Sequence, residues 1–225
     1  PRDRIVALLL AVLCPVRILE RMLGAPAGRA ETDLATVIFS SGSEGEPKGA
    51  LLTHANIMKN VEAMLTVYPR KHGDTIMGIL PFFHSYGFTG TLWTPLLGDM
   101  SVVFHPSPLE PKAIGELIHK YKATFFIATC TFIQSFIKRC APEELSSLVH
   151  VICGAEKLSA RVREAFLEKF GVEPVEGYGA TECSPVISVN LPNIQYGQVN
   201  QINTKYGSVG RPLPGVSLRV LDVDS

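Results

Sequence analysis

The sequence predicts an α/β fold with mainly parallel β-sheets flanked by helices. Short apolar runs rich in β-branched and aromatic residues, such as residues 35–39 and 124–128, have the composition of buried strands. Segments with apolar residues at helical spacing lie between these runs, and the resulting crossovers are too long for hairpins. Long crossovers imply parallel strands with both faces covered, and such sheets bind ligands beyond the carboxyl ends of their strands.

Local signals place the individual helices and strands. Thr53 has the side chain of an N-cap for a helix to about Tyr68, and Ser159 and Gly171 would begin and end another helix. Pro111 lies near the start of a third helix, because apolar residues at helical spacing follow it. The expected strands are residues 35–39, 76–80, 102–104, 124–128, 149–153 and 172–175, and apolar character also resumes at residues 51–52.

The first apolar stretch, residues 5–16, contains no charged residue and is too short to span a bilayer. It is either a buried helix of the domain or a helix at a membrane interface, and we favour the buried helix. Residues 24–28 are typical of a linker. Residues 1–28 are therefore predicted to form an apolar helix and linker, and residues 29–225 the domain that follows.

The charge and the cysteine content limit the classes of function. Lysine plus arginine and aspartate plus glutamate number 21 each, so there is no electrostatic reason to expect nucleic-acid binding. The five cysteines contain no Cys-x-x-Cys pair, which predicts neither a zinc site nor a disulfide framework and favours a reducing cytosol. For Cys130 a nucleophilic role is conceivable, but a buried structural thiol is the favoured interpretation.

Residues 40–49 read Ser-Ser-Gly-Ser-Glu-Gly-Glu-Pro-Lys-Gly and connect two apolar runs. The glycines let backbone N–H groups turn toward an anion, while the serine hydroxyls and Lys48 offer further donors. An ordinary hairpin turn is the alternative, but such a turn needs only one or two glycines. Pro47 before the lysine and Gly49 after it exclude a Walker loop, in which the lysine is followed by serine or threonine. The segment therefore predicts a different kind of phosphate-binding loop.

Three further segments follow predicted strands and carry residues suited to chemistry. His84 lies among aromatic residues, and an isolated histidine there would be interpreted as a core residue. Gly154 and Ala155 are small enough for a ligand to approach the backbone closely, although a plain strand-to-helix turn has the same pattern. Residues 176–185 contain a tyrosine that can stack on a base, a threonine that can bind phosphate and a glutamate that can hold Mg²⁺; a solvated glycine turn is the alternative.

In this order, the four segments resemble the motifs of the acyl-adenylate-forming enzymes, which include acyl-CoA synthetases, luciferases and peptide-synthetase adenylation domains. The resemblance implies ATP and Mg²⁺ as cofactors, and it implies that residues 29–225 are part of the family's large N-terminal AMP-binding domain. The family's ribose-binding aspartate, its C-terminal lid domain and its catalytic lysine are expected beyond Ser225. We therefore expect this chain to bind ATP weakly and to form acyl-adenylate inefficiently. One departure is Glu44, where the family usually has threonine.

The resemblance also implies roles for single residues. His84 would position the acyl carboxylate or acyl phosphate, with Phe83 and Tyr86 shaping the pocket. Tyr178 would stack on adenine, and Thr181 would contact the α-phosphate. The residues implied in catalysis are His84, Lys48, Thr181 and Glu182, with Glu182 as the magnesium ligand. The residues implied in ATP binding are Ser40, Ser41, Gly42, Ser43, Gly45, Lys48, Gly154, Ala155, Tyr178, Gly179 and Thr181.

The implied reaction is attack of a fatty-acid carboxylate on the α-phosphorus of ATP. The acyl group would then pass from the acyl-adenylate to the thiol of coenzyme A or of acyl-carrier protein. The Ser-Gly-Ser-Glu-Gly loop, Asn190-Leu-Pro-Asn and Glu182-Cys-Ser-Pro most resemble the synthetase part of bifunctional 2-acylglycerophosphoethanolamine acyltransferase/acyl-carrier-protein synthetases. This implies a lysophospholipid partner for the parent protein, possible membrane association and a place at the cytoplasmic face of the inner membrane. A long-chain acyl-CoA synthetase and a non-catalytic nucleotide- or lipid-binding module are the alternatives.

Overall fold

The computed structural model describes residues 10, 13–22, 24, 30–40, 47–68, 70–191, 193–196 and 199–222. The chain divides into two compact units, Pro1–Asp33 and Leu34–Ser225. In the first unit, helix α2 (Val16–Met22) leaves Ile18 and Met22 exposed, as is Leu13 before it. Residues 5–9, 11 and 12 lie outside the described residues, so the buried helix expected over residues 5–16 stays a prediction. Among the described residues, no helix combines the length and the apolar character needed to cross a membrane.

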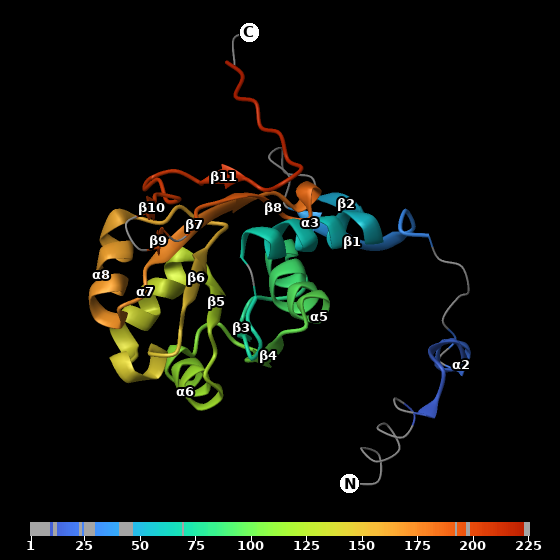
Figure 1. Ribbon diagram of the computed structural model, residues 1–225, viewed down its shortest axis with the longest axis horizontal. Helices are drawn as coiled ribbons and strands as arrows, with labels where there is room; N and C mark the ends of the chain where they lie inside the picture. Colours follow the sequence, from blue (N-terminus) through green and yellow to red (C-terminus); the bar gives the residue numbers. More distant parts are fainter. Residues whose placement is uncertain are drawn as a thin grey trace. The chain divides into compact units, whose positions relative to one another are not determined.

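The second unit is built on a seven-stranded sheet (Figure 1). Its strands, in sheet order, are β11 (Arg211–Pro212), β8 (Val186–Val189), β7 (Pro174–Gly179), β6 (His150–Cys153), β5 (Phe125–Ala128), β3 (Thr75–Gly78) and β4 (Ser101–Phe104). The five strands from β7 to β4 are parallel, whereas β8 and β11 pair in the antiparallel sense. The carboxyl ends of the parallel strands therefore share one edge. This arrangement confirms the predicted α/β class.

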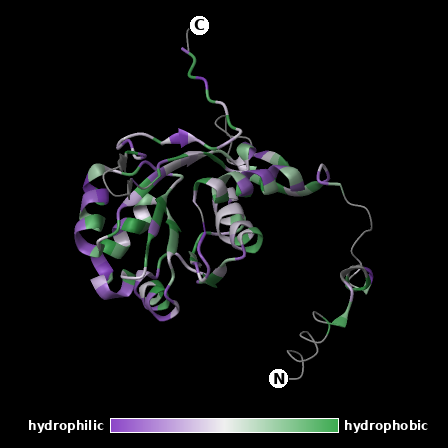
Figure 2. Cartoon of the chain, in the orientation of Figure 1, coloured by the Kyte–Doolittle hydropathy of each residue, from purple (hydrophilic) through white to green (hydrophobic). Residues whose placement is uncertain are grey.

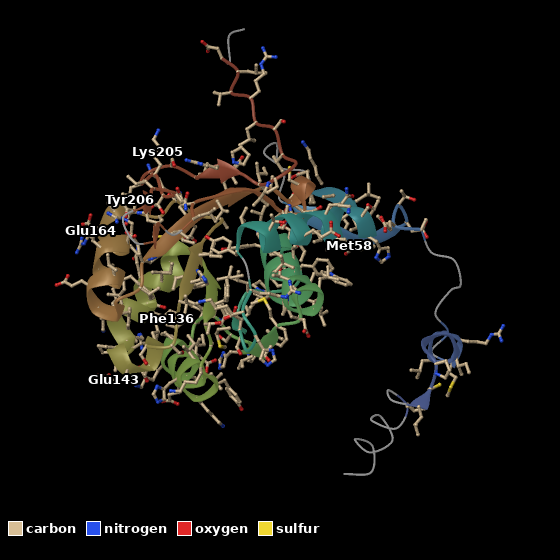
Figure 3. The ribbon with its side chains drawn as sticks, in the orientation of Figure 1. Met58, Phe136, Glu143, Glu164, Lys205 and Tyr206 are labelled. Carbon is tan, nitrogen blue, oxygen red and sulfur yellow. The ribbon has the colours of Figure 1, made fainter. Side chains whose placement is uncertain are left out.

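Helices cover both faces of the sheet (Figure 1). On one face lie α6 (Pro111–Tyr121), α7 (Cys130–Arg139) and α8 (Ala160–Phe170); on the other lie α3 (His54–Val67) and α5 (Thr94–Gly98). Because strand side chains alternate, Met77 and Phe126 pack toward α6–α8, while Ile76 and Phe125 pack toward α3. Apolar residues concentrate on the strands and polar ones on the outer side of α8 (Figure 2). Phe136 of α7 points into this core and is fully buried (Figure 3).

The helix ends follow the predicted local signals. The Thr53 hydroxyl accepts a hydrogen bond from the Asn56 N–H, and the Asn56 side chain accepts one from the Thr53 N–H. The Ser159 hydroxyl accepts a hydrogen bond from the Val162 N–H at 3.3 Å at the start of α8, and Gly171 ends the helix in the left-handed conformation with φ of 72°. Two differences concern β3, which ends at Gly78 instead of residue 80, and β7, which begins at Pro174 and continues through Gly179.

Some elements were not predicted from the sequence. Helix α7 is one, and the continuous helical segment after β3 is another. That segment consists of α4 (Ser85–Gly87), the π-helical turn η1 (Phe88–Trp93) and α5. The strands β8 and β11 were not predicted either, and the remaining short elements are η2 (Pro142–Leu145), η3 (Thr181–Cys183), β9 (Ile194–Tyr196) and β10 (Val199–Gln201).

The predicted phosphate-binding loop connects an antiparallel pair, β1 (Leu34–Ser40) and β2 (Lys48–Thr53). Ser40 lies opposite Lys48, so the two ends of the loop are held side by side. Ile38 and Leu52 anchor the pair by packing against Ile57 of α3. The order of strand, loop and strand is thus confirmed, and the loop is itself the connection of a hairpin.

Asn60 ties α3 to the chain segment that follows β7. Its side-chain amide donates to the carbonyl oxygens of Cys183 at 3.3 Å and Val186 at 2.7 Å. In return, its carbonyl oxygen accepts from the Val186 N–H at 3.2 Å. Since Asn60 is 8% exposed, these backbone groups have little access to water, and the side chain replaces it as their partner.

We predict that Asn60→Ala lowers the free energy of unfolding by about 2–4 kcal/mol, because each buried backbone group left unpaired costs about 1–3 kcal/mol. Urea denaturation followed by circular dichroism measures this change. The control is Lys59→Ala on the same helix, where the side chain is 68% exposed and a loss of about 0.5 kcal/mol or less is expected. Equal losses in the two variants would contradict the role given to Asn60.

Candidate active site

The loops after β3, β6 and β7 enclose a cavity of about 290 Å³ at the carboxyl edge of the sheet. Each of the three predicted segments that lie in these loops contributes to its lining. The residues implied in ATP binding or catalysis that line the cavity are His84, Gly154, Ala155, Tyr178, Gly179 and Thr181. Tyr86, which was expected to shape the pocket, also lines it, whereas Phe83 is 81% exposed and does not. The fold therefore brings segments from distant parts of the sequence to one place.

His84 lines the cavity, and one of its two ring nitrogens accepts a hydrogen bond from the protein itself. Its Nδ1 accepts a hydrogen bond from the Tyr86 N–H at 3.2 Å, which caps the short helix α4. A neutral imidazole that accepts at Nδ1 carries its proton on Nε2. The turn that places the ring is tight, because a Cβ on Gly87 would lie 2.4 Å from the Pro81 carbonyl oxygen. His84 therefore presents an Nε2–H donor, which is suited to a carboxylate.

Tyr86 packs directly on the backbone that follows β6. Its hydroxyl donates to the Ile152 carbonyl oxygen at 3.1 Å, and burial raises the pKa of Tyr86 well above its ordinary value. A Cβ added to Gly154 would lie 2.8 Å from the Tyr86 ring. Glycine is thus needed at this position for the protein's own packing, a reason that the sequence did not reveal. The next residue, Ala155, adopts the left-handed conformation with φ of 62°, where side chains are rare.

The segment after Tyr178 is fixed by contacts between its own two ends. A Cβ on Gly179 would lie 2.3 Å from the Pro185 carbonyl oxygen, so the chain can pass this close only at a glycine. The Ala180 N–H donates to the same carbonyl oxygen at 2.9 Å. Tyr178 itself is 49% exposed and borders the cavity, so one face of its ring is available to a flat ligand.

Two hydroxyl groups join the loop after β3 to the loop after β7. The Ser85 and Thr181 side-chain oxygens lie 3.1 Å apart within hydrogen-bond distance. The Thr89 hydroxyl donates to the Ser184 carbonyl oxygen at 3.0 Å. Sequence reasoning missed both contacts, since a single serine or threonine gives no sign of a distant partner.

Three more of the predicted residues are described and do not line the cavity, namely Ser40, Lys48 and Glu182. Ser40 and Lys48 face each other at the base of the β1–β2 loop, where the Ser40 hydroxyl donates to the Lys48 carbonyl oxygen at 3.5 Å. Glu182 is exposed on η3, which lies near β2. Ser41, Gly42, Ser43, Glu44 and Gly45 lie outside the described residues.

Glu182 is the one residue proposed as a metal ligand. Within the described part of the chain, no three His, Cys, Asp or Glu residues are grouped so as to hold a metal ion. A single carboxylate fits Mg²⁺, which keeps several waters and is commonly bound by one or two carboxylates together with substrate phosphates. The residues present therefore fit a magnesium ion that arrives with a phosphate ligand.

The cavity continues from these loops into an apolar interior between α3 and the sheet. The Tyr68 hydroxyl donates to the Asn190 carbonyl oxygen at 2.7 Å, which fixes that ring in the wall. Gly90 of η1 packs against Ile127, where an added Cβ would lie 3.3 Å from the Ile127 Cδ1, and both residues border the cavity. The apolar walls, which the sequence presented as ordinary core residues, include Met64, Leu65, Tyr68, Ile76, Phe125 and Ile127.

Two residues near the site have structural roles. Cys130 is 6% exposed, which confirms the interpretation as a buried thiol. Glu156, just after the Gly154–Ala155 turn, accepts hydrogen bonds from the Thr131 N–H and hydroxyl, both at 2.8 Å. These bonds join the turn to the first residues of α7.

Curated relatives of this chain include CoA ligases. A long-chain-fatty-acid–CoA ligase of Bacillus subtilis is 32% identical over 196 residues, which are 84% of this chain and 33% of that protein. The probable 4-coumarate–CoA ligase 1 of Dictyostelium discoideum is 36% identical over 199 residues, covering 86% of this chain and 34% of the relative. The chain thus spans about a third of the length of the curated relatives it matches.

Solved structures share the fold. The apo structure of MatB from Rhodopseudomonas palustris matches with a TM-score of 0.76 and 26% identity over 88% of this chain and 37% of that chain. The O-succinylbenzoate coenzyme A synthetase MenE of Bacillus subtilis, solved with ATP and magnesium ion, matches with a TM-score of 0.70 and 25% identity over 82% of this chain and 36% of its own. A family model described as AMP-binding enzyme matches residues 16–225. The chain therefore belongs to the family of AMP-binding enzymes.

Proposed function

We propose that the protein activates a fatty acid as an acyl-adenylate with ATP and Mg²⁺ and then passes the acyl group to a thiol. The observation that carries this proposal is the single cavity that joins the polar carboxyl edge of the sheet to an apolar interior. A ligand that fills such a cavity has a polar, flat end and an apolar tail. An acyl-adenylate is a molecule of this kind.

The edge of the sheet supplies the nucleotide end of the proposed site. Tyr178 offers a ring for stacking on adenine, and Gly154 and Gly179 leave the backbone accessible. Thr181 supplies a hydroxyl for the α-phosphate. Ser40 and Lys48 stand at the base of the loop proposed for the outer phosphates. The ATP and magnesium ion in the related MenE structure support this assignment.

The apolar interior supplies the acyl end. A fatty-acid tail between α3 and the sheet would leave its carboxylate near His84, whose Nε2–H can donate to it. The name of the Bacillus subtilis relative, a long-chain-fatty-acid–CoA ligase, supports a fatty acid as the substrate. His84 would therefore orient the nucleophile for the reaction.

In the proposed first step, a carboxylate oxygen bonds to the α-phosphorus of ATP. The bond from that phosphorus to the bridging oxygen of the β-phosphate breaks, and pyrophosphate leaves with the electron pair. Lys48 and the loop would stabilise the charge that develops on the leaving group, while Thr181 would donate to the α-phosphate. Magnesium held by Glu182 would supply charge neutralisation at the phosphates.

The proposed acceptor is the phosphopantetheine thiol of acyl-carrier protein, as the likeness of residues 40–49 and 182–185 to acyl-carrier-protein synthetases suggests. The acylated carrier would then serve lysophospholipid acylation in the parent protein, at the cytoplasmic face of the inner membrane. The second candidate acceptor is coenzyme A, which the names of the related ligases favour. Both acceptors present the same phosphopantetheine thiol.

The hexadecyl ester of AMP tests the proposed site, because it keeps the α-phosphate and the tail but cannot hydrolyse as an acyl phosphate does. We expect calorimetry to show at least tenfold tighter binding of this ester than of AMP, since each buried methylene contributes about 0.8 kcal/mol. Tyr178→Ala should weaken binding of both ligands about tenfold, the usual effect of losing a stacked aromatic. Tyr121→Ala is the matched control, because both tyrosines are 49% exposed. Equal affinities for the ester and AMP would contradict the proposed function.

Gly90→Leu tests the path of the tail. We expect this variant to bind the hexadecyl ester at least tenfold more weakly, because the larger side chain displaces Ile127 and fills part of the apolar interior that both residues border. Binding of the methyl ester of AMP should stay unchanged, which serves as the internal control for folding. Gly90→Ala should show a smaller effect of the same kind. An equal loss for both esters would contradict a tail that passes Gly90.

The acceptor is tested by giving the protein hexadecanoyl-AMP together with either holo-acyl-carrier protein or coenzyme A. We expect thioester to form faster with the carrier protein, measured by mass spectrometry against the rate without enzyme. Faster transfer to coenzyme A would assign the protein to the second candidate function.

A further inference from the structure

We propose that Ser85 is a positioning residue that directs the Thr181 hydroxyl toward the α-phosphate. This inference rests on the proposed function, because it concerns the phosphate that Thr181 would bind there. Ser85 lies between His84 and Tyr86 and lines the same cavity.

The Ser85 side chain is enclosed and has a defined partner. The residue is 1% exposed, and its hydroxyl oxygen lies 3.1 Å from the Thr181 hydroxyl oxygen. This is the side-chain hydrogen bond that Ser85 makes within the described ranges of the chain. A buried hydroxyl is costly without a partner, so the pair is expected to persist whichever residue donates.

The direction of this hydrogen bond follows once a phosphate is bound. A hydroxyl has a single hydrogen to donate, and the ionised oxygen of a phosphodiester has none. Thr181 must therefore give its hydrogen to the phosphate oxygen. Its own oxygen then becomes the acceptor for the hydrogen of Ser85. The result is a relay from Ser85 through Thr181 to the phosphate.

Such a relay has two physical effects. It removes the rotational freedom of the Thr181 hydroxyl, so that its hydrogen points at the phosphate. It also strengthens the terminal hydrogen bond, because successive hydrogen bonds polarise one another in a region with little water. Both effects require the Ser85 hydrogen, and a side chain that only fills the same space would provide neither.

The backbone at Ser85 is fixed by its neighbours. His84 caps the turn through its Nδ1, and Gly87 lies against the Pro81 carbonyl oxygen, where no larger residue fits. The Ser85 hydroxyl is thereby held at a constant position relative to the loop after β7. Ser85 thus links the loop proposed for the acyl carboxylate to the residue proposed for the phosphate.

The test is a double-mutant cycle in binding of the hexadecyl ester of AMP, measured by calorimetry. We expect Thr181→Val to weaken binding about tenfold or more, and Ser85→Ala to weaken it about threefold to tenfold. The double variant should bind no more weakly than Thr181→Val alone, because Ser85 acts only through Thr181. Ser85→Cys, a weaker donor of similar size, should lie between wild type and Ser85→Ala.

A ligand without phosphate distinguishes a relay through Thr181 from a purely structural role of Ser85. Ser85→Ala should bind the 5′-hexadecyl ether of adenosine as well as wild type does. The matched comparison is Thr89→Val, which removes a buried hydroxyl bonded to the Ser184 carbonyl oxygen in the same loop. Thr89→Val should weaken binding of the ester and of the ether by the same factor, since it displaces the whole loop after β7.

The possible failures differ from one another. If wild type does not bind the hexadecyl ester more tightly than AMP, the proposed function fails and this inference fails with it. If wild type binds it but Ser85→Ala binds equally well, only the inference is overturned. Multiplicative losses in the double variant, or equal losses on ester and ether, would likewise overturn it.

Discussion

The parallel alignment of β3, β5, β6 and β7 is the constraint on which the candidate active site depends. Parallel pairing sends every strand of this group in the same direction, so each following loop emerges at the same edge. Ser85 and Thr181, which are 96 residues apart in the sequence, meet there at hydrogen-bond distance. A change in the direction of one strand would separate the end of the cavity proposed for the nucleotide from the end proposed for the acyl group.

Close packing of glycines holds these loops in place once the strands have brought them together. Gly87 lies against a carbonyl oxygen, Gly154 against the Tyr86 ring and Gly179 against the Pro185 carbonyl oxygen. At each position an added Cβ would come within 2.9 Å of those atoms, so even alanine would require the neighbours to move. The small residues of the site therefore serve the protein's own packing as well as access for a ligand.

The fold class and several helices could be predicted because their signals are local. Thr53 and Ser159 cap helices with their own side chains, and Gly171 ends one through its backbone freedom. The helical segment from α4 to α5 could not be predicted in this way. It contains glycines and a proline, and a π-helical turn shifts its apolar spacing.

For the candidate site, the sequence predicted the segments that take part but not the contacts that they make. Four segments were recognisable by composition and order, but the partner of each side chain depends on residues far away in the sequence. Asn60, Ser85 and Gly90 carry no local sign of their contacts. The walls of the cavity were equally hidden, because an apolar side chain beside a ligand and one in the core obey the same pattern.

Helix α3 connects the loop after β7 with the apolar interior of the cavity. Asn60 holds the loop after Thr181, and Met64, one turn later and about 6 Å along the helix axis, borders the apolar interior. A fatty-acid tail that displaces Met64 would act on helix α3, the same rigid element that holds the loop after β7. Binding free energies coupled through such an element are reciprocal. In the proposed function, a fatty acid that changes the affinity for the nucleotide would have its own affinity changed by the nucleotide by the same factor.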